Sequence, residues 1–324
     1  MSWRFAILAG LSSLLLVVPT TVFSAPPEPE ELGTWRFRKP DRPVKVISLG
    51  GSVAAKLRGS YSQLLGAACR RVEVVNIAKA RIGARQLKER FVKQVLKNRR
   101  LNLKSHEETW LLFQGGLNSL STPGLTNEKT REIFAGAHRK GIRTVGITLG
   151  PWGSAKRWFG ADGLDALRRT RAVVDFVMGK LSPSEALGRY AKGRTEWSEG
   201  DLPNIAVNIY DSKLRDDQAP PLEQKNMQRR LRRDRRIARE LKHIPEAFRE
   251  SALERLAADA QALSNQFMKA RYKGFDSIHP NNAGHKVIAE EICAKVPATW
   301  DCSCQLIAKM AWDKKARSLR PIAE

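Results

Sequence analysis

Histidine and cysteine are scarce in this chain of 324 residues, which has five of the first and four of the second. Beyond residue 24, no run approaches the ~20 apolar residues that a membrane-spanning helix needs. Cys302 and Cys304 have a Cys-x-Cys spacing, but no histidine lies near them in the sequence to complete a metal site. We therefore expect no metal, and nothing in the sequence indicates an organic cofactor.

Acidic residues are also few compared with basic ones. The chain has 33 Asp and Glu against 57 Lys and Arg, which gives a formal net charge of +24. Such a charge attracts anionic partners, and cell-wall polymer, lipopolysaccharide, an anionic lipid surface and nucleic acid all qualify. The sequence lacks basic strands interleaved with aromatic residues, the pattern that stacks on bases, and this argues against nucleic acid.

The first 24 residues have the layout of a secretory signal peptide. A short basic start precedes an apolar stretch from Phe5 to Val18, and small residues lead to a cleavage site after Ser24. The alternative is an uncleaved membrane anchor, and the lack of a nearby cysteine argues against a lipoprotein. We predict an exported protein, periplasmic or extracellular, in which the Pro- and Glu-rich residues 25–43 form an extended arm or tether.

The four cysteines fit the oxidising environment of an exported protein. An even number is compatible with two disulfides among Cys69, Cys293, Cys302 and Cys304, and three connectivities exist. Pairing Cys302 with Cys304 is the least favourable because it would close a tiny loop. The sequence leaves the other two connectivities open.

Five apolar, β-branched runs recur at the spacing of an α/β protein. They are Val44–Leu49, Val72–Ile77, Thr109–Gln114, Thr144–Leu149 and Ile205–Tyr210. The segments between them, at about 53–69, 84–100, 127–140 and 163–181, are typical of helices. Strands that alternate with helices predict a parallel sheet with helices on both faces.

Polar residues follow the first three of these predicted strands. Ser52 comes after the first strand in Gly50-Gly51-Ser52, Asn76 closes the second, and Asn118 follows the third in Gly115-Gly116-Leu117-Asn118. The carboxyl ends of parallel strands meet at one edge of a sheet, so we expect these residues to converge there. We also expect Ser52 to lie at the N-terminus of the next helix, where the helix dipole favours negative charge.

The run Asp276-Ser277-Ile278-His279-Pro280 places an aspartate three residues before a histidine. This spacing lets the carboxylate bind the imidazole Nδ1–H, while Nε2 faces outward to take a proton. With Ser52 earlier in the chain, the order Ser…Asp-x-x-His indicates a serine hydrolase. We interpret the nearby His285 as a structural or surface residue rather than a second base.

Residues 221–272 interrupt the alternation of strands and helices. Lys225 to Lys242 contains nine Lys and Arg against two acidic residues, and a second periodic run follows Pro245, which is well placed to begin a helix. We predict an inserted basic helical hairpin. It is either a pair of ordinary amphipathic helices with a solvated face or a lid or docking arm beside the active site. Residues 307–324 are predicted to form a basic tail.

The chain resembles the SGNH, or GDSL-type, hydrolases from about Val44 to Ile292. Asp276 to His285 resembles the family's fifth block almost residue for residue, and Gly116-Leu117-Asn118 matches its third block. Gly50-Gly51-Ser52 resembles the first block, with Gly51 where the family has an aspartate. The resemblance implies a flavodoxin-like α/β/α sandwich with a five-stranded parallel sheet over residues 44–306.

The resemblance also implies roles for three residues. Ser52 would attack an acyl carbonyl, and His279 would accept the proton and later pass it to the leaving alkoxide. Asp276 would hold the imidazole tautomer and stabilise the imidazolium.

The same resemblance implies an oxyanion hole. It would consist of the backbone N–H of Ser52, the N–H of Gly83 and the side-chain amide of Asn118. In the family's second block a glycine follows the asparagine by five residues, whereas Gly83 follows Asn76 by seven. The N–H of Arg81 is therefore the alternative to that of Gly83.

Two tryptophans, Trp152 and Trp158, follow the fourth predicted strand and either line the substrate cleft or belong to the core. The predicted protein is an exported serine esterase that removes acetyl or another short acyl group from a cell-envelope or polysaccharide substrate. The positive charge favours a polymer that carries negative charge, with peripheral contact to membrane or cell wall through the basic hairpin. An O-acyltransferase with the same triad and a non-catalytic module that binds anionic polymer are the alternatives.

Overall fold

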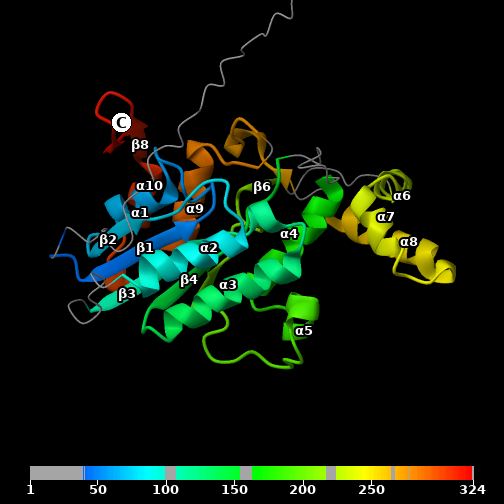
Figure 1. Cartoon of the computed structure of the whole chain (residues 1–324). Coiled ribbons are helices and arrows are strands. Elements are labelled where there is room, and N and C mark those ends of the chain that lie inside the picture. Colours follow the sequence, from blue (N-terminus) through cyan, green and yellow to red (C-terminus); the bar gives the residue numbers. More distant parts are fainter. Residues whose placement is uncertain are drawn as a thin grey trace, which may run out of the picture.

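The structure is a computed structural model that describes residues 39, 41–98, 107–153, 163–216, 224–263, 267–276 and 278–322. The predicted signal peptide, 1–24, and most of the predicted N-terminal tether, 25–43, lie outside the described residues. Figure 1 shows a central sheet with helices on both sides and a group of helices that projects from one end. Within the described ranges, no helix is both long enough and apolar enough to cross a membrane.

Five parallel strands form the central sheet, in the order β2-β1-β3-β4-β5. They are β1 (Val44–Gly50), β2 (Val72–Asn76), β3 (Glu108–Gln114), β4 (Arg143–Ile147) and β5 (Ile205–Val207). This is the flavodoxin-like strand order, and it confirms the predicted fold class and all five predicted strands. Only β5 is clearly shorter than predicted.

Ten α-helices are described. They are α1 (Tyr61–Ala68), α2 (Ala84–Phe91), α3 (Pro123–His138), α4 (Gly163–Val177), α5 (Pro183–Leu187), α6 (Gln224–Arg232), α7 (Arg235–Leu241), α8 (Glu246–Leu263), α9 (Asn282–Cys293) and α10 (Cys304–Ala308). A π-helical segment, Val92–Leu96, continues α2, and short 3-10 turns lie at Leu117–Ser119, Gly188–Tyr190, Ala270–Tyr272 and Ala298–Trp300.

The helices cover the two faces of the sheet because each strand alternates its side chains between them. On β1, Val46 packs with residues of α1 and α9 in one buried cluster, whereas Ile47 packs with residues of α2 and α3 in another. Every residue of β1 is buried. Two covered faces explain why the strand reads as an apolar run rather than as alternating apolar and polar residues.

The first and third predicted helices begin elsewhere than expected. The helix predicted from 53 begins at Tyr61, because Ser60 and Gln63 form a capping box at that point. The helix predicted from 127 begins four residues earlier, at Pro123, a residue that suits the first position of a helix.

The C-terminal segment is not a tail, so this part of the prediction is wrong. Strands β8 (Met310–Asp313) and β9 (Ser318–Pro321) pair antiparallel after α10. Buried residues Ile307 and Met310 belong to the core cluster that α1 and α9 share. The basic residues of the segment obscured this apolar anchoring in the sequence.

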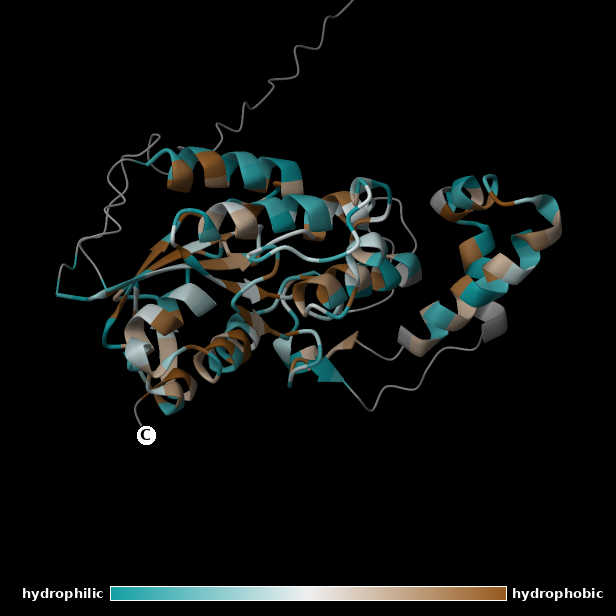
Figure 2. Ribbon diagram, turned by 90° about the horizontal axis from the view of Figure 1, so that it is seen from below, coloured by the Kyte–Doolittle hydropathy of each residue, from teal (hydrophilic) through white to brown (hydrophobic). Residues whose placement is uncertain are grey.

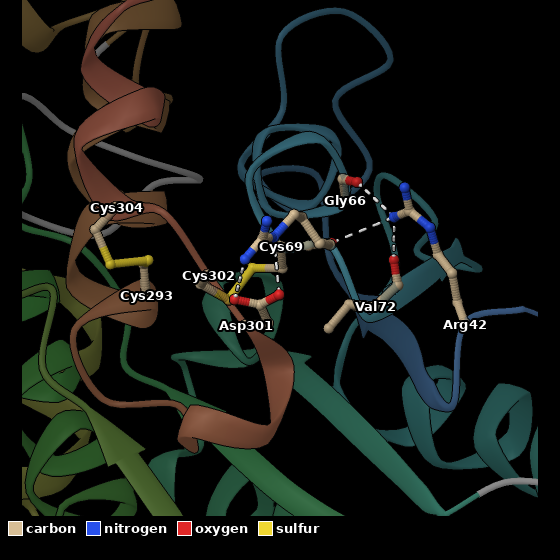
Figure 3. The surroundings of a disulfide bond; sticks show 9 residues. Arg42, Gly66, Cys69, Val72, Cys293, Asp301, Cys302 and Cys304 are labelled. Carbon is tan, nitrogen blue, oxygen red and sulfur yellow. Dashed lines mark hydrogen bonds and ion pairs between the residues drawn. A yellow bond between two sulfur atoms is a disulfide. The ribbon is translucent and has the colours of Figure 1, made fainter.

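Two disulfides attach this segment to the sandwich (Figure 3). Cys69, at the end of α1, bonds Cys302, and Cys293, at the end of α9, bonds Cys304. Around the first disulfide, Arg70 forms an ion pair with Asp301, with 2.8 Å between Nε and Oδ2. This pairing of the four cysteines is one of the two connectivities that the sequence left open.

Helices α6, α7 and α8 form the projecting group, which we call the arm and define as residues 224–263. Figure 2 shows it lying to one side of the α/β body. The strands β6 (Arg215–Asp216) and β7 (Phe267–Met268), which pair antiparallel, flank it in the sequence. The first predicted helix of the hairpin is divided into α6 and α7 by a break at the buried Asp234.

The arm contacts the body through an apolar seam and through ion pairs. Met227, Leu231 and Leu253 join one buried cluster with residues of α4. Beside it, the guanidinium of Arg169 in α4 lies 2.5 Å from Oε1 of Glu240 in α7. The arm is therefore packed against the sandwich rather than linked to it by its connections alone.

Candidate active site

Ser52 lies in a single helical turn directly after β1. The Gly51 N–H donates to the carbonyl of Gln114 at the end of β3 (3.0 Å), and the Ala55 N–H donates to the carbonyl of Gly51 (2.9 Å). These bonds hold the turn against the carboxyl edge of the sheet. The expectation that Ser52 lies at the N-terminus of a helix is wrong, because α1 begins only at Tyr61.

An imidazole lies in hydrogen-bond contact with Ser52, and a carboxylate lies in hydrogen-bond contact with that imidazole. Nε2 of His279 is 2.7 Å from Oγ of Ser52, and Nδ1 of His279 is 2.6 Å from Oδ2 of Asp276. The structure thus brings together the three residues that the sequence predicted, in one hydrogen-bonded chain. The side chains of His279 and Asp276 are only 21% and 19% exposed, so the chain is partly shielded from solvent.

The Asp276 carboxylate is kept ionised by its own loop. Partial burial would raise its pKa, but the backbone N–H groups of Ile278 and His279 donate to Oδ1, and the His279 ring contacts Oδ2. Together these contacts hold the pKa of Asp276 below its usual value. A carboxylate of this kind fixes the orientation of the imidazole and stabilises its protonated form.

The loop that carries His279 is fixed at both ends. The Gly274 N–H donates to the His279 carbonyl (2.8 Å), and a Cβ at Gly274 would lie 2.5 Å from that carbonyl oxygen. Asn281 caps α9 and also donates its side-chain amide to the carbonyls of Arg271 and Lys273. His279 is therefore held by a closed turn and by the start of a helix.

An inner pocket opens from Ser52 toward the sheet. It is lined by Gly51, Ser52, Val53, Ile82, Gln114, Gly115, Gly116, Leu117, Asn118, Leu149, Gly150, Pro151, Trp152 and Ile278. Its volume of about 30 Å³ leaves room for a group about the size of two water molecules. Its walls come from the segments at the carboxyl ends of β1, β2, β3 and β4, together with Ile278 of the His279 loop.

Asn118 is the side-chain amide that lines this pocket together with Ser52. It lies two residues after Gly116, whose φ of +111° a residue with a side chain would rarely adopt. A Cβ added at Gly116 would lie 2.8 Å from Cγ2 of Thr126. Nδ2 of Asn118 donates to the carbonyl of Ile82 (3.1 Å), which fixes the amide plane. The glycine thus turns the chain so that Asn118 reaches the pocket beside Ser52.

The structure does not bring Gly83 to the inner pocket as an oxyanion donor. Its N–H donates to Oε1 of Gln86 (3.2 Å), because Gly83 is the N-cap of α2 and the side chain of Gln86, three residues on, reaches back to the N-cap backbone. Neither Gly83 nor Arg81 is among the described residues that line the pocket, whereas Ile82, between them, is. The geometry therefore does not favour either residue for the role that the sequence prediction assigned.

Asn76 has a positioning role that the sequence did not reveal. Its Nδ2 donates to the carbonyl of Ala54 (2.9 Å) and to Oγ of Ser62 (3.1 Å). The first of these bonds ties the end of β2 to the turn that carries Ser52.

Trp152 belongs to the core and also lines the inner pocket, so both of its predicted alternatives hold; its side chain is 1% exposed. Trp158 lies outside the described residues.

An outer groove of about 690 Å³ lies on the other side of Ser52. It is lined by Ser52, Val53, Lys56, Gly274, Phe275, His279, Pro280, Asn281, Asn282, Ala283 and His285. Phe275 is 93% exposed, and its ring stacks on that of His279, with centroids 5.6 Å apart and planes at 10°. The imidazole that contacts Ser52 therefore forms part of the groove wall.

His285 is a structural residue of this groove, as the sequence interpretation had it. It is 1% exposed, and its Nδ1 accepts the backbone N–H of Tyr61 (3.3 Å). Burial, helped by the nearby Lys56 and His279, lowers the pKa of His285 to about 3. The ring is therefore neutral at neutral pH and adds no charge to the groove.

No model of a known protein family matches the chain, and no curated protein matches it significantly. Solved structures similar to it include a GDSL-like lipase from Bacteroides thetaiotaomicron, with 12% identity, a TM-score of 0.40, and coverage of 80% of this chain and 90% of that one. A member of the lipolytic G-D-S-L family from Veillonella parvula has 12% identity, a TM-score of 0.41 and coverage of 76% and 95%.

An acetylxylan esterase from Geobacillus stearothermophilus, solved as a catalytic mutant, has 12% identity, a TM-score of 0.39 and coverage of 79% and 95%. Two of these three descriptions name the GDSL type that the sequence motifs resemble. At such identities and TM-scores the likeness carries no argument about activity, which has to come from the site itself.

Proposed function

We propose that this chain is an exported serine esterase that removes a short acyl group, acetyl above all, from an acylated polymer. The observation that carries the proposal is the hydrogen-bonded chain from Asp276 through His279 to Ser52. A serine hydroxyl is a weak nucleophile until a base accepts its proton, and this geometry supplies the base and the group that orients it.

The reaction would proceed in two halves around the Ser52 oxygen. Oγ attacks the ester carbonyl while Nε2 of His279 accepts the hydroxyl proton, and the carbonyl oxygen becomes an oxyanion. The Ser52 N–H and the Asn118 amide, which line the same pocket, stabilise that negative charge. His279 then protonates the leaving alkoxide, and a water molecule activated by His279 hydrolyses the acyl-enzyme.

The inner pocket supports a small acyl group. A cavity of about 30 Å³ beside the nucleophile accommodates a methyl group but not a long alkyl chain. In contrast, the outer groove of about 690 Å³ is open and gives room for a large alcohol. This asymmetry favours a substrate with a small acyl part and a bulky alcohol part.

A polymeric, anionic substrate is supported by the charge of the arm. Its exposed basic residues include Arg229, Arg232, Arg233, Arg235, Arg239 and Lys242. Because Glu240 is engaged by Arg169 of the body, it does little to offset this charge. Export is supported by the two disulfides, which persist in oxidising compartments.

The test is hydrolysis of p-nitrophenyl acetate by the wild type, Ser52→Ala and His279→Ala. We expect each variant to lower kcat by at least about 10³-fold, since each removes a member of a unit that acts together. Ser251→Ala and His243→Ala, which change exposed residues of the arm and its inter-helix turn, are matched controls and should keep full activity. Activity that survives in Ser52→Ala would exclude the proposed mechanism.

A fluorophosphonate label separates an inactive site from an unsuitable substrate. The proposal predicts that the label attaches to Ser52 and that His279→Ala slows the reaction, because labelling needs the same activated hydroxyl. An unlabelled wild type would favour the alternative of a non-catalytic module that binds anionic polymer through the arm. That module would be retained on an anionic matrix equally well with Ser52 or Ala at this position.

An O-acyltransferase is the second candidate, and the open outer groove favours it. An acyl-enzyme in this site can be attacked by a bound sugar hydroxyl as readily as by water if the alcohol occupies the groove. Addition of a sugar acceptor to the p-nitrophenyl acetate assay would then yield the acetylated sugar at the expense of free acetate.

A further inference from the structure

Lys56 is the one charged residue, apart from the histidines, among the described residues that line the outer groove. It lies four residues after Ser52, just beyond the turn that carries the nucleophile. Among the described residues it makes no hydrogen bond and no ion pair, although it is partly buried. Burial lowers the pKa of Lys56, which is the response of an ammonium group that lacks a compensating anion.

No carboxylate among the described residues lines this groove to offset that charge. Asp276, the acidic residue of the His279 loop, is engaged by the His279 ring and by two backbone N–H groups. His285, which faces Lys56, is held neutral. An unpaired ammonium in a partly desolvated groove is costly, so a bound anion would stabilise it.

The position of His279 decides which part of a substrate lies in this groove. Its Nε2 must reach the leaving oxygen in order to protonate it, so the alcohol part of the ester lies on the side of His279. That side is the outer groove, where the exposed ring of Phe275 stacks against His279. A flat apolar ring at this point gives a sugar or another ring a surface on which to lie.

On the basis of the proposed esterase function, we propose that the outer groove is a binding site for an alcohol that carries a negative charge, with Lys56 as the residue that selects it. The ligand class is an acylated hydroxyl compound with a carboxylate or phosphate close to the ester, such as an O-acetylated uronic acid. The site therefore recognises charge in the leaving group, and not in the acyl group.

A pair of esters that differ only in this charge tests the proposal. 4-Acetoxybenzoate carries a carboxylate on the leaving group, and methyl 4-acetoxybenzoate is its neutral counterpart. The quantity compared is the ratio of kcat/KM for the anionic ester to kcat/KM for the neutral one, which cancels any general loss of folding or activity.

Lys56→Met should lower this ratio about tenfold, mainly through a higher KM for the anionic ester, since one charge-assisted contact is lost. Lys56→Arg retains the charge and should keep most of the preference. Lys140→Met removes the same charge from an exposed position after α3 and should leave the ratio as in the wild type.

The proposal is overturned if Lys56→Met has the wild-type ratio, or if Lys140→Met lowers the ratio equally, because the effect would then belong to the overall charge. 4-Acetoxyphenyl phosphate extends the test to a phosphate on the leaving group. If Lys56→Met lowers the kcat/KM ratio more for the phosphate ester than for the carboxylate ester, the phosphate is the better ligand, and the reverse result identifies the carboxylate. A wild type that hydrolyses neither these esters nor p-nitrophenyl acetate contradicts the esterase function itself. Hydrolysis without an anionic preference contradicts only the charge-selective groove.

Discussion

The inner pocket and the outer groove meet at Ser52, but they are assembled in different ways. The pocket takes its walls from segments at the carboxyl ends of four strands of the sheet, β1 to β4, with Ile278 added from the His279 loop. The groove comes from two short segments, 52–56 and 274–285. In the proposed mechanism, stabilisation of the oxyanion thus depends on the geometry of the whole sheet, whereas proton transfer and recognition of the alcohol depend on local turns.

The largest effect that separates the two regions is expected for Asn118→Ala. Loss of one donor from the pocket should lower kcat for p-nitrophenyl acetate by about 10²–10³-fold, with a smaller change in KM, because the oxyanion forms only in the transition state. Steady-state kinetics measure this, and an unchanged unfolding transition would show that the fold is intact. A loss of less than threefold would exclude Asn118 from the oxyanion hole.

The groove side is expected to show a pH effect on stability through His285. Its folded pKa of about 3 lies below its unfolded value, so its neutral form stabilises the protein fully above about pH 6.5. As the pH falls from 6.5 to 4.5, the unfolded chain gains a proton that the folded chain does not. This should lower the free energy of unfolding by about 2–3 kcal/mol.

Urea unfolding of the wild type and of His285→Gln at several pH values isolates this contribution. Gln cannot titrate but can still accept the Tyr61 N–H, so the variant should lose this part of the pH dependence. Equal slopes for the two proteins between pH 6.5 and 4.5 would contradict the assignment. The carboxylates and the other histidines contribute equally to the pH dependence of both proteins, so their contributions cancel in the comparison.

The smallest effect is expected when the pocket is enlarged. Leu149 lines the inner pocket and is only 6% exposed, so Leu149→Ala should open space beside the acyl group. Preference for p-nitrophenyl butyrate over the acetate should rise about tenfold, since one or two methylene groups are worth this much in a hydrophobic pocket. Leu57→Ala, a change at an exposed leucine that lies outside both cavities, is the control. If acyl-chain preference does not change, the pocket does not hold the acyl group.

The sequence predicted the sheet and the three residues of the hydrogen-bonded chain, Ser52, His279 and Asp276, because both depend on local patterns. Apolar β-branched runs mark the buried strands, and the Asp276–His279 pair needs only a short turn to form. The start of α1 was also readable, since Ser60 and Gln63 have the spacing of a capping box. That signal would have corrected the expectation for Ser52.

Other features depend on contacts that the sequence does not contain. Gly83 has the right neighbours for an oxyanion donor, but Gln86 takes its N–H as α2 begins. That Lys56 has no partner among the residues that the structure describes is a property of the folded groove, and nothing in the sequence pattern indicates it. The same holds for the pairing of Cys69 with Cys302, which are 233 residues apart.

The disulfide between Cys69 and Cys302 closes a covalent loop that contains both the arm and the His279 loop. Ser52 lies before this loop and His279 lies within it. A protease that cuts after an exposed arginine of the arm, such as Arg239, would leave Ser52 on one fragment and His279 on the other. The disulfide would still join the two fragments, so a nicked protein would migrate as one species until it is reduced. Attack by proteases on the arm would therefore not by itself separate the two halves of the active site.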